Sequence, residues 1–145
     1  MIQSLLLCLV FSLPGAWDSW SFLIGEWVGE GAGGSGGFSF QFDLQGKVLV
    51  RKNRAEYPAT KDRGASVHED LMVVYQEGGR TRAIYFDTED HTINYTAAFP
   101  ADQNSLIFLS DVSPSAPRYR LTYTKTTGET LAIRFEIAQI GRAHV

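Results

Sequence analysis

Two short segments of this chain combine histidine with carboxylates, the side chains that most often hold metal ions or move protons. They are His68-Glu69-Asp70 and Asp87-Thr88-Glu89-Asp90-His91. Within a strand, however, adjacent residues point to opposite faces, and turns are rich in Asp and Glu for purely structural reasons. Taken singly, neither segment predicts a metal site, and we assign no metal ligand from the sequence.

The sequence offers few other catalytic patterns. It contains neither a Gly-x-Ser-x-Gly elbow nor a His-Glu-x-x-His zinc motif, and its only cysteine is Cys8, near the N-terminus. The glycine-rich segment at 31–36 matches the dinucleotide fingerprint formally, but a strand pattern follows where that fingerprint needs a helix. We therefore predict no catalytic residue and favour a function without catalysis.

A charge pair inside the fold is a sharper hypothesis. Arg51 shares a strand face with Leu49, and Glu69 shares one with the apolar and aromatic residues two, four and six positions later. If both faces point inward, Arg51 needs a carboxylate such as Glu69, or an acidic ligand, because an unpaired buried charge is costly. The alternative is that both segments are solvated. The register also stays open, since Val48 and Val50 compete with Leu49 for the core.

The elements that would position these side chains are short strands joined by tight turns. In residues 38–44, phenylalanine and leucine alternate with polar residues, which is the period of a half-buried strand. With a first strand around Trp27, nine strands are predicted, the others at 47–57, 67–77, 80–87, 91–99, 105–112, 118–124 and 130–137. This order predicts an all-β fold, an antiparallel up-and-down meander that closes into a barrel or folds into a sandwich.

The start of the folded part carries a family resemblance. Gly25-x-Trp27-x-Gly29-x-Gly31-x-Gly33 resembles the first strand of the calycin β-barrels, which include lipocalins, fatty-acid-binding proteins and nitrobindin-like barrels. The resemblance implies that residues 22–24 plug the barrel floor and that Trp27 lies across the base of the core. It also implies a barrel of nine to ten strands, with the last expected to be missing from this chain. The alternative for the glycines is a flexible linker.

Both ends are expected to lie outside the barrel domain, which we place at residues 17–138. The apolar run at 5–13 and the following Pro-Gly-Ala are typical of a secretory signal, here residues 1–16, which predicts a secreted or periplasmic protein. The last residues, 140–145, can be encoded by a nucleotide sequence that resembles a sequencing-library adapter. We therefore treat 139–145 as a non-native tail and do not use His144 as a ligand.

Composition narrows the range of partners. The formal net charge is −3, which argues against nucleic acid and, after signal cleavage, against an anionic membrane as partner. An exported chain without a disulfide in its folded part depends on packing for stability, and aromatic residues make up 12% of the sequence.

The candidate binding residues come from the predicted inner face, where the plain alternative is a filled core. A barrel of this size can also leave room for one small ligand. The predicted ligand-binding set is Phe40, Phe42, Arg51, Glu69, Tyr75, Tyr95, Phe108, Tyr123 and Phe135.

Three functions remain open at this point. The first is a non-enzymatic exported barrel that binds a small apolar or amphipathic molecule, with no cofactor. The second follows from the nitrobindin-like resemblance, which implies haem and an action on reactive nitrogen species; the Tyr-Pro expected after the glycines is missing here, and the family's haem histidine lies in the portion expected to be lost. The third is a structural envelope domain with a filled barrel.

Overall fold

A computed structural model describes residues 15–31, 33–102, 104–127 and 129–138, which form one antiparallel sheet and two short 3-10 helices. The helices are η1 (Asp18–Leu23) and η2 (Leu44–Gly46), and the strands are β1 (Gly25–Val28), β2 (Ser35–Asp43), β3 (Val48–Tyr57), β4 (Ser66–Glu77), β5 (Arg80–Asp87), β6 (Thr92–Ala98), β7 (Ser105–Ser110), β8 (Arg118–Lys125) and β9 (Leu131–Ala138). The predicted all-β meander is confirmed. Residues 1–14 of the predicted signal and the predicted tail at 139–145 lie outside the described residues.

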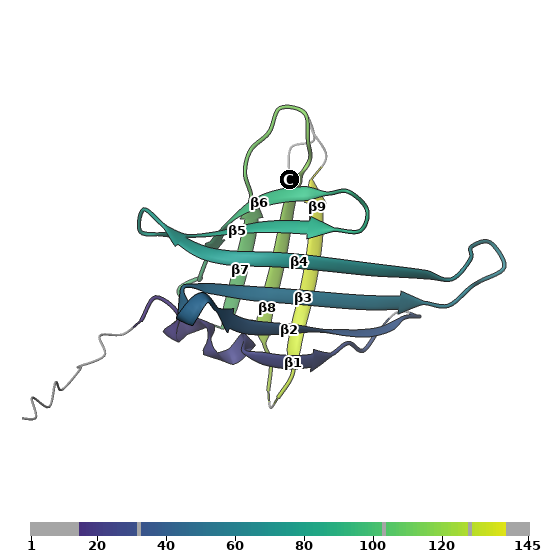
Figure 1. The fold of residues 1–145 in the computed structure, drawn as a ribbon, viewed down its shortest axis with the longest axis horizontal. Coiled ribbons are helices and arrows are strands. Elements are labelled where there is room, and N and C mark those ends of the chain that lie inside the picture. The colour runs from purple at the N-terminus through teal and green to yellow at the C-terminus, as the bar shows by residue number, and fades with distance from the viewer. Residues whose placement is uncertain (1–14, 32, 103, 128, 139–145) are drawn as a thin grey trace, which may run out of the picture.

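The sheet curls into a half-barrel. Each strand pairs with its neighbours in the sequence, so the strand order runs from β1 to β9 without a crossover. Strands β1 to β5 lie side by side in Figure 1, and β7 to β9 cross behind them. Within the described ranges, β1 and β9 each pair on one side only, and closure into a calycin-like barrel stays a prediction. No helix in those ranges is long and apolar enough to span a membrane.

The register of β3 shows which of its residues face the core, which the sequence left open. Leu49 lies opposite Val74 and is fully buried, and Arg51 lies opposite Met72 and is also buried. Val48 and Val50 alternate with them and therefore face outward. The inner face of the half-barrel thus carries Arg51 within an otherwise apolar row.

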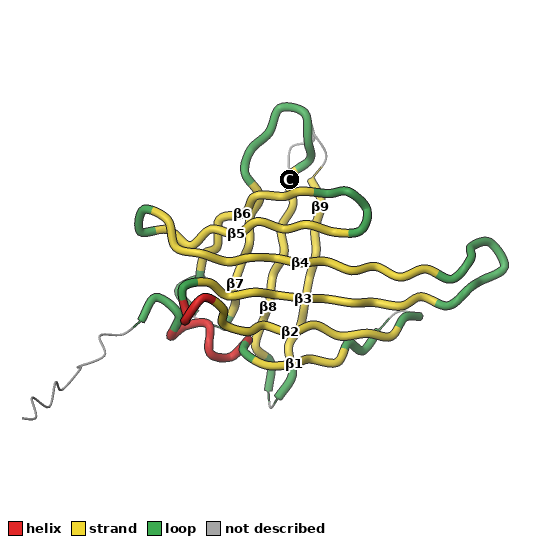
Figure 2. Tube along the Cα trace, in the orientation of Figure 1, coloured by secondary structure: helices red, strands yellow, loops and turns green. Residues whose placement is uncertain are grey.

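One end of the half-barrel is plugged by η1. Figure 2 shows both 3-10 helices at the same end of the sheet. Trp20 and Leu23 of η1 are fully buried, and the Trp20 ring lies 5.4 Å from that of Phe99 and 5.7 Å from that of Phe108. Trp27 donates its indole N–H to the Leu23 carbonyl at 2.9 Å. Leu23 therefore lies in the buried core as expected, together with Trp20 of the same helix, which lies outside the expected range.

The glycine-rich segment joins two paired strands of the sheet, and only its two ends lie within strands. Gly25 begins β1, whereas Gly29, Gly31 and Gly33 lie between β1 and β2. Gly37 of β2 pairs with both Val28 and Arg54, so it is held between two strands. A Cβ added at Gly37 would overlap the carbonyl oxygen of Trp27. Glycine is required there because the β1 backbone approaches too closely for a side chain.

The close approach of the β1 backbone to Gly37 can be tested by substitution. Gly37→Ala should destabilise the protein by about 1–3 kcal/mol, because the new methyl group forces β1 and β2 apart. Gly64→Ala is the matched control, since nothing lies within 4 Å of a Cβ added at Gly64, and it should change stability by less than about 0.5 kcal/mol. Urea unfolding of both variants measures the difference. Equal stabilities would show that β1 does not pack here as described.

Candidate functional site

A cavity of about 500 Å³ lies inside the half-barrel, beyond the plugged apolar core. Its polar wall comes from β3 to β6 and the β5–β6 turn, and its apolar wall comes from β8 and β9. The residues lining it are Arg51, Tyr57, His68, Asp70, Tyr85, Asp87, Glu89, His91, Ile93, Tyr95, Tyr119, Leu121, Ile133, Phe135 and Ile137. A single molecule in this cavity would therefore touch ionic groups on one side and hydrocarbon on the other.

The β9 part of the apolar wall is open to solvent. Ile133, Phe135 and Ile137 share a face of β9 with the inward residues of β8, yet their exposed fractions are 46%, 53% and 51%. Phe135 stacks on Tyr119 with ring centroids 5.9 Å apart. A contiguous row of large apolar side chains facing a cavity is unusual for a free surface and is typical of a surface that another molecule covers.

A buried ion pair anchors the polar wall. Arg51 donates to Asp70, and the side chains of both residues are more than nine-tenths buried. Asn53 donates to the second Asp70 oxygen at 2.9 Å, and the guanidinium of Arg51 lies 5.4 Å from the centre of the Phe38 ring. The sequence predicted that a buried Arg51 needs a carboxylate such as Glu69, or an acidic ligand; the carboxylate is that of Asp70, and Glu69 as the partner was wrong. Glu69 faces outward, where it accepts from Arg54 at 2.8 Å, because the strand alternation places Asp70 inside.

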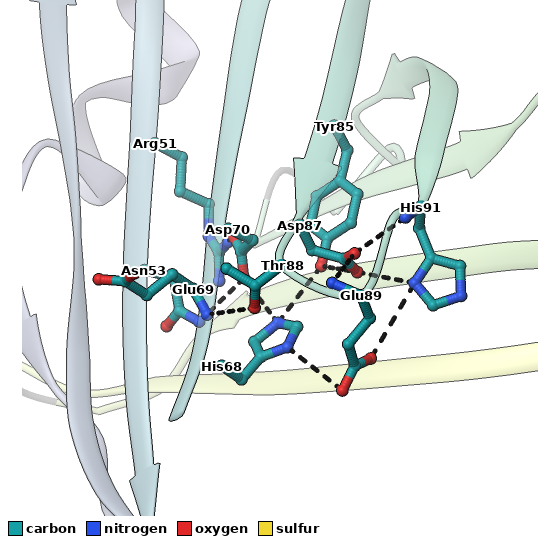
Figure 3. Close-up of polar contacts among 10 residues, drawn as sticks. All are labelled: Arg51, Asn53, His68, Glu69, Asp70, Tyr85, Asp87, Thr88, Glu89 and His91. Carbon is teal, nitrogen blue, oxygen red and sulfur yellow. Dashed lines mark hydrogen bonds and ion pairs between the residues drawn. The ribbon is translucent and has the colours of Figure 1, made fainter. Parts of the chain in front are cut away.

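A second polar group surrounds Asp87 at the end of β5 (Figure 3). Its carboxylate accepts backbone N–H groups of Glu89 at 2.9 Å and His91 at 3.0 Å, and it also contacts the His91 Nδ1 at 2.9 Å. Burial alone would raise the pKa of Asp87, but the hydrogen bonds from His91 and Glu89 outweigh it and hold that pKa below its usual range. Asp87 is therefore a buried carboxylate that stays ionised.

Tyr85 lies between these two groups. Its hydroxyl donates to Asp87 at 3.2 Å and lies 3.5 Å from the His68 Nε2. Burial raises the pKa of Tyr85 strongly, and the Asp70 and Asp87 carboxylates raise it further. The phenol therefore remains protonated and acts as a hydrogen-bond donor. The same carboxylates, together with Glu89, outnumber the single guanidinium of Arg51 in the polar wall.

The predicted binding residues fall into three groups. Arg51, Tyr95 and Phe135 line the cavity. Phe40, Phe108 and Tyr123 lie in the buried core, where burial raises the pKa of Tyr123 to about 12. The rest lie away from both: Phe42 is on the inner face but packs on Trp17 at 5.9 Å near the plug, while Glu69 and Tyr75 are on the outer face.

Most of the polar wall was missed at the sequence level. Asp70 was read with its neighbours as a solvated or metal-compatible run, and Tyr85 was not singled out. The β4–β5 pairing places Asp70 directly opposite Asp87. The sequence gives no signal that selects this face of β4, because Leu71 and Val73 on the outer face are as apolar as Met72 and Val74 on the inner face.

The buried ion pair of Arg51 and Asp70 can be tested by substitution. Arg51→Met should destabilise the protein by about 3–5 kcal/mol, because it leaves the Asp70 carboxylate buried without its cation. Glu69→Gln on the adjacent outer face should leave stability almost unchanged, since its ion pair with Arg54 is exposed. Chemical denaturation compares the two. A large loss in Glu69→Gln with a small one in Arg51→Met would contradict this assignment of partners.

Comparison with protein-family models and with curated proteins found no match for this chain.

Proposed function

We propose that this protein is an exported, non-enzymatic barrel that binds one small amphipathic molecule in the cavity. The observation that carries the proposal is the opposition of an open apolar wall on β8 and β9 to an ionic wall on β3 to β6. The cavity volume, about 500 Å³, is within the range of small-molecule sites. A structural barrel would instead fill this space with its own side chains.

The two walls specify the kind of ligand. An alkyl chain or aromatic ring placed against Ile133, Phe135 and Ile137 would cover side chains that are now half exposed. The polar end of the ligand would then face Asp87, Glu89 and the two histidines. Because carboxylates predominate there, a neutral or cationic head group fits the site better than a fatty-acid carboxylate.

Haem binding, the nitrobindin-like alternative, has one supporting observation. His68 and His91 both line the cavity, so an iron ligand is available within it. His91, however, contacts Asp87 at 2.9 Å, and His68 lies 3.3 Å from Asp70 at its Nε2, so each imidazole already faces a carboxylate. We therefore rank haem below an amphipathic molecule as the ligand, and the binding test includes haem.

The binding test compares three amphiphiles with one chain length and different head groups. Dodecyltrimethylammonium and dodecanoate are titrated calorimetrically below their micelle concentrations and dodecanol below its solubility limit. EDTA is present to remove trace metal ions, and haem is followed by its absorption band. We expect saturable binding of the cation or the alcohol, and weaker binding of the carboxylate. A shifted haem band that is lost in His68→Ala would favour the haem alternative. Absence of binding by all four would remove the proposed function.

Paired substitutions on β9 locate the site. Phe135→Ala should weaken amphiphile binding by about three- to tenfold, because it removes much of the apolar wall. Arg134→Ala is the matched control, since Arg134 faces outward on the same strand and its side chain is 78% exposed. Its affinity should equal that of the unaltered protein. Equal losses in both variants would place the ligand elsewhere.

A further inference from the structure

We propose that His68, Asp87 and Glu89 form a binding site for a divalent transition-metal ion of the Zn²⁺ type at the edge of the cavity. One candidate ligand atom from each residue lies within 4.8 Å of those of the other two. The three come from the two segments that, taken singly, predict no site. The pairing of β4 with β5 brings His68 beside the turn that carries Asp87 and Glu89.

The distances are those of a site that needs little rearrangement. Zn²⁺ holds nitrogen and oxygen ligands at about 2.0–2.2 Å in a tetrahedron, which puts neighbouring ligand atoms about 3.3–3.5 Å apart. In the structure, His68 Nδ1 lies 3.8 Å from one Glu89 oxygen, and His91 Nδ1 lies 4.0 Å from the other. Figure 3 shows the Glu89 carboxylate between the two imidazoles. The ligand atoms of His68, Asp87 and Glu89 lie within 4.8 Å of one another, so a contraction of at most about 1.5 Å would bring them to the tetrahedral spacing.

The surroundings match those of a metal centre. Ligating carboxylates are themselves held by hydrogen bonds, which fix their orientation and raise affinity. Asp87 is fixed in this way by two backbone N–H groups and by Tyr85. Its side chain is 4% exposed, so it is a rigid anionic ligand, whereas Glu89, with a side chain 64% exposed, is free to close over an ion. His91 contacts Asp87 and is placed either to orient it or to serve as the fourth ligand.

Electrostatics supplies an independent reason. Asp87 and Glu89 each offer an oxygen within 4.8 Å of the other, Asp70 lies opposite Asp87 in the β4–β5 pairing, and Arg51 pairs with Asp70 alone among the three. Like charges in a partly buried region repel strongly unless protons or a cation offset them. Imidazole with carboxylate is a ligand set that suits Zn²⁺ and its neighbours, and it would hold Mg²⁺ or Ca²⁺ poorly because those ions prefer oxygen ligands alone.

The test measures Zn²⁺ binding in the absence of any amphiphile, so it is independent of the proposed carrier function. Two other zinc-compatible residues, Cys8 and His144, lie outside the described residues, and the titrations therefore use a Cys8→Ser, His144→Ala background. We expect one Zn²⁺ per chain by calorimetry and tetrahedral-type visible bands with Co²⁺. Mg²⁺ should give no saturable signal at the same concentration.

Glu89→Gln should weaken Zn²⁺ binding by at least about tenfold, the usual effect of losing a partner at a metal centre, and its exposure makes a folding defect unexpected. Glu69→Gln, the residue next to His68 on the opposite face, is the matched control and should bind as the background does. His68→Gln should weaken binding and remove the Co²⁺ bands. Equal affinities in Glu89→Gln and Glu69→Gln, or no saturable Zn²⁺ binding by the background protein, would overturn the proposal.

Discussion

The interior of this half-barrel depends on the buried pair of Arg51 and Asp70. Below it, towards η1, the inner face is apolar and closely packed around Trp20, and above it the inner face carries ionic and hydroxyl groups. Arg51 bridges the two regions, since its guanidinium approaches the Phe38 ring on one side and binds Asp70 on the other. Without a cation at this level, the carboxylates of the polar wall would face the core directly, and their desolvation would oppose the packing beneath them.

The elements of the fold could be predicted because each strand is a local pattern. Alternation placed β3 and β5 to within one residue of their observed bounds, and the predicted strands 67–77 and 80–87 leave between them the two residues that form the β4–β5 turn. The start of β2 was missed by three residues because Ser35, Gly36 and Gly37 have low strand propensity. They are extended because β3 pairs with all three and β1 also pairs with Gly37, which is a tertiary effect.

The site could be predicted far less well, because it depends on which strand faces meet. Arg51 was identified, but its partner was not, since choosing between Glu69 and Asp70 requires the parity of β4. Likewise, neighbouring residues on one strand were rightly expected to point apart, yet residues on two paired strands converge, as His68 and Asp87 do. The half-exposed face of β9 was invisible to the sequence because Ile133 and Phe135 alternate like any core strand.

The strict succession of neighbours in the sheet has a kinetic consequence. Every strand pairs only with the one before and the one after it, so each hairpin can form as soon as its second strand has been synthesised, and the loops to be closed are short. The insertion of Trp20 is different, because its ring must meet Phe99 and Phe108 from strands far along the chain. The sheet can therefore grow progressively from its first hairpin, while docking of the plug waits for β7 and locks the assembled core.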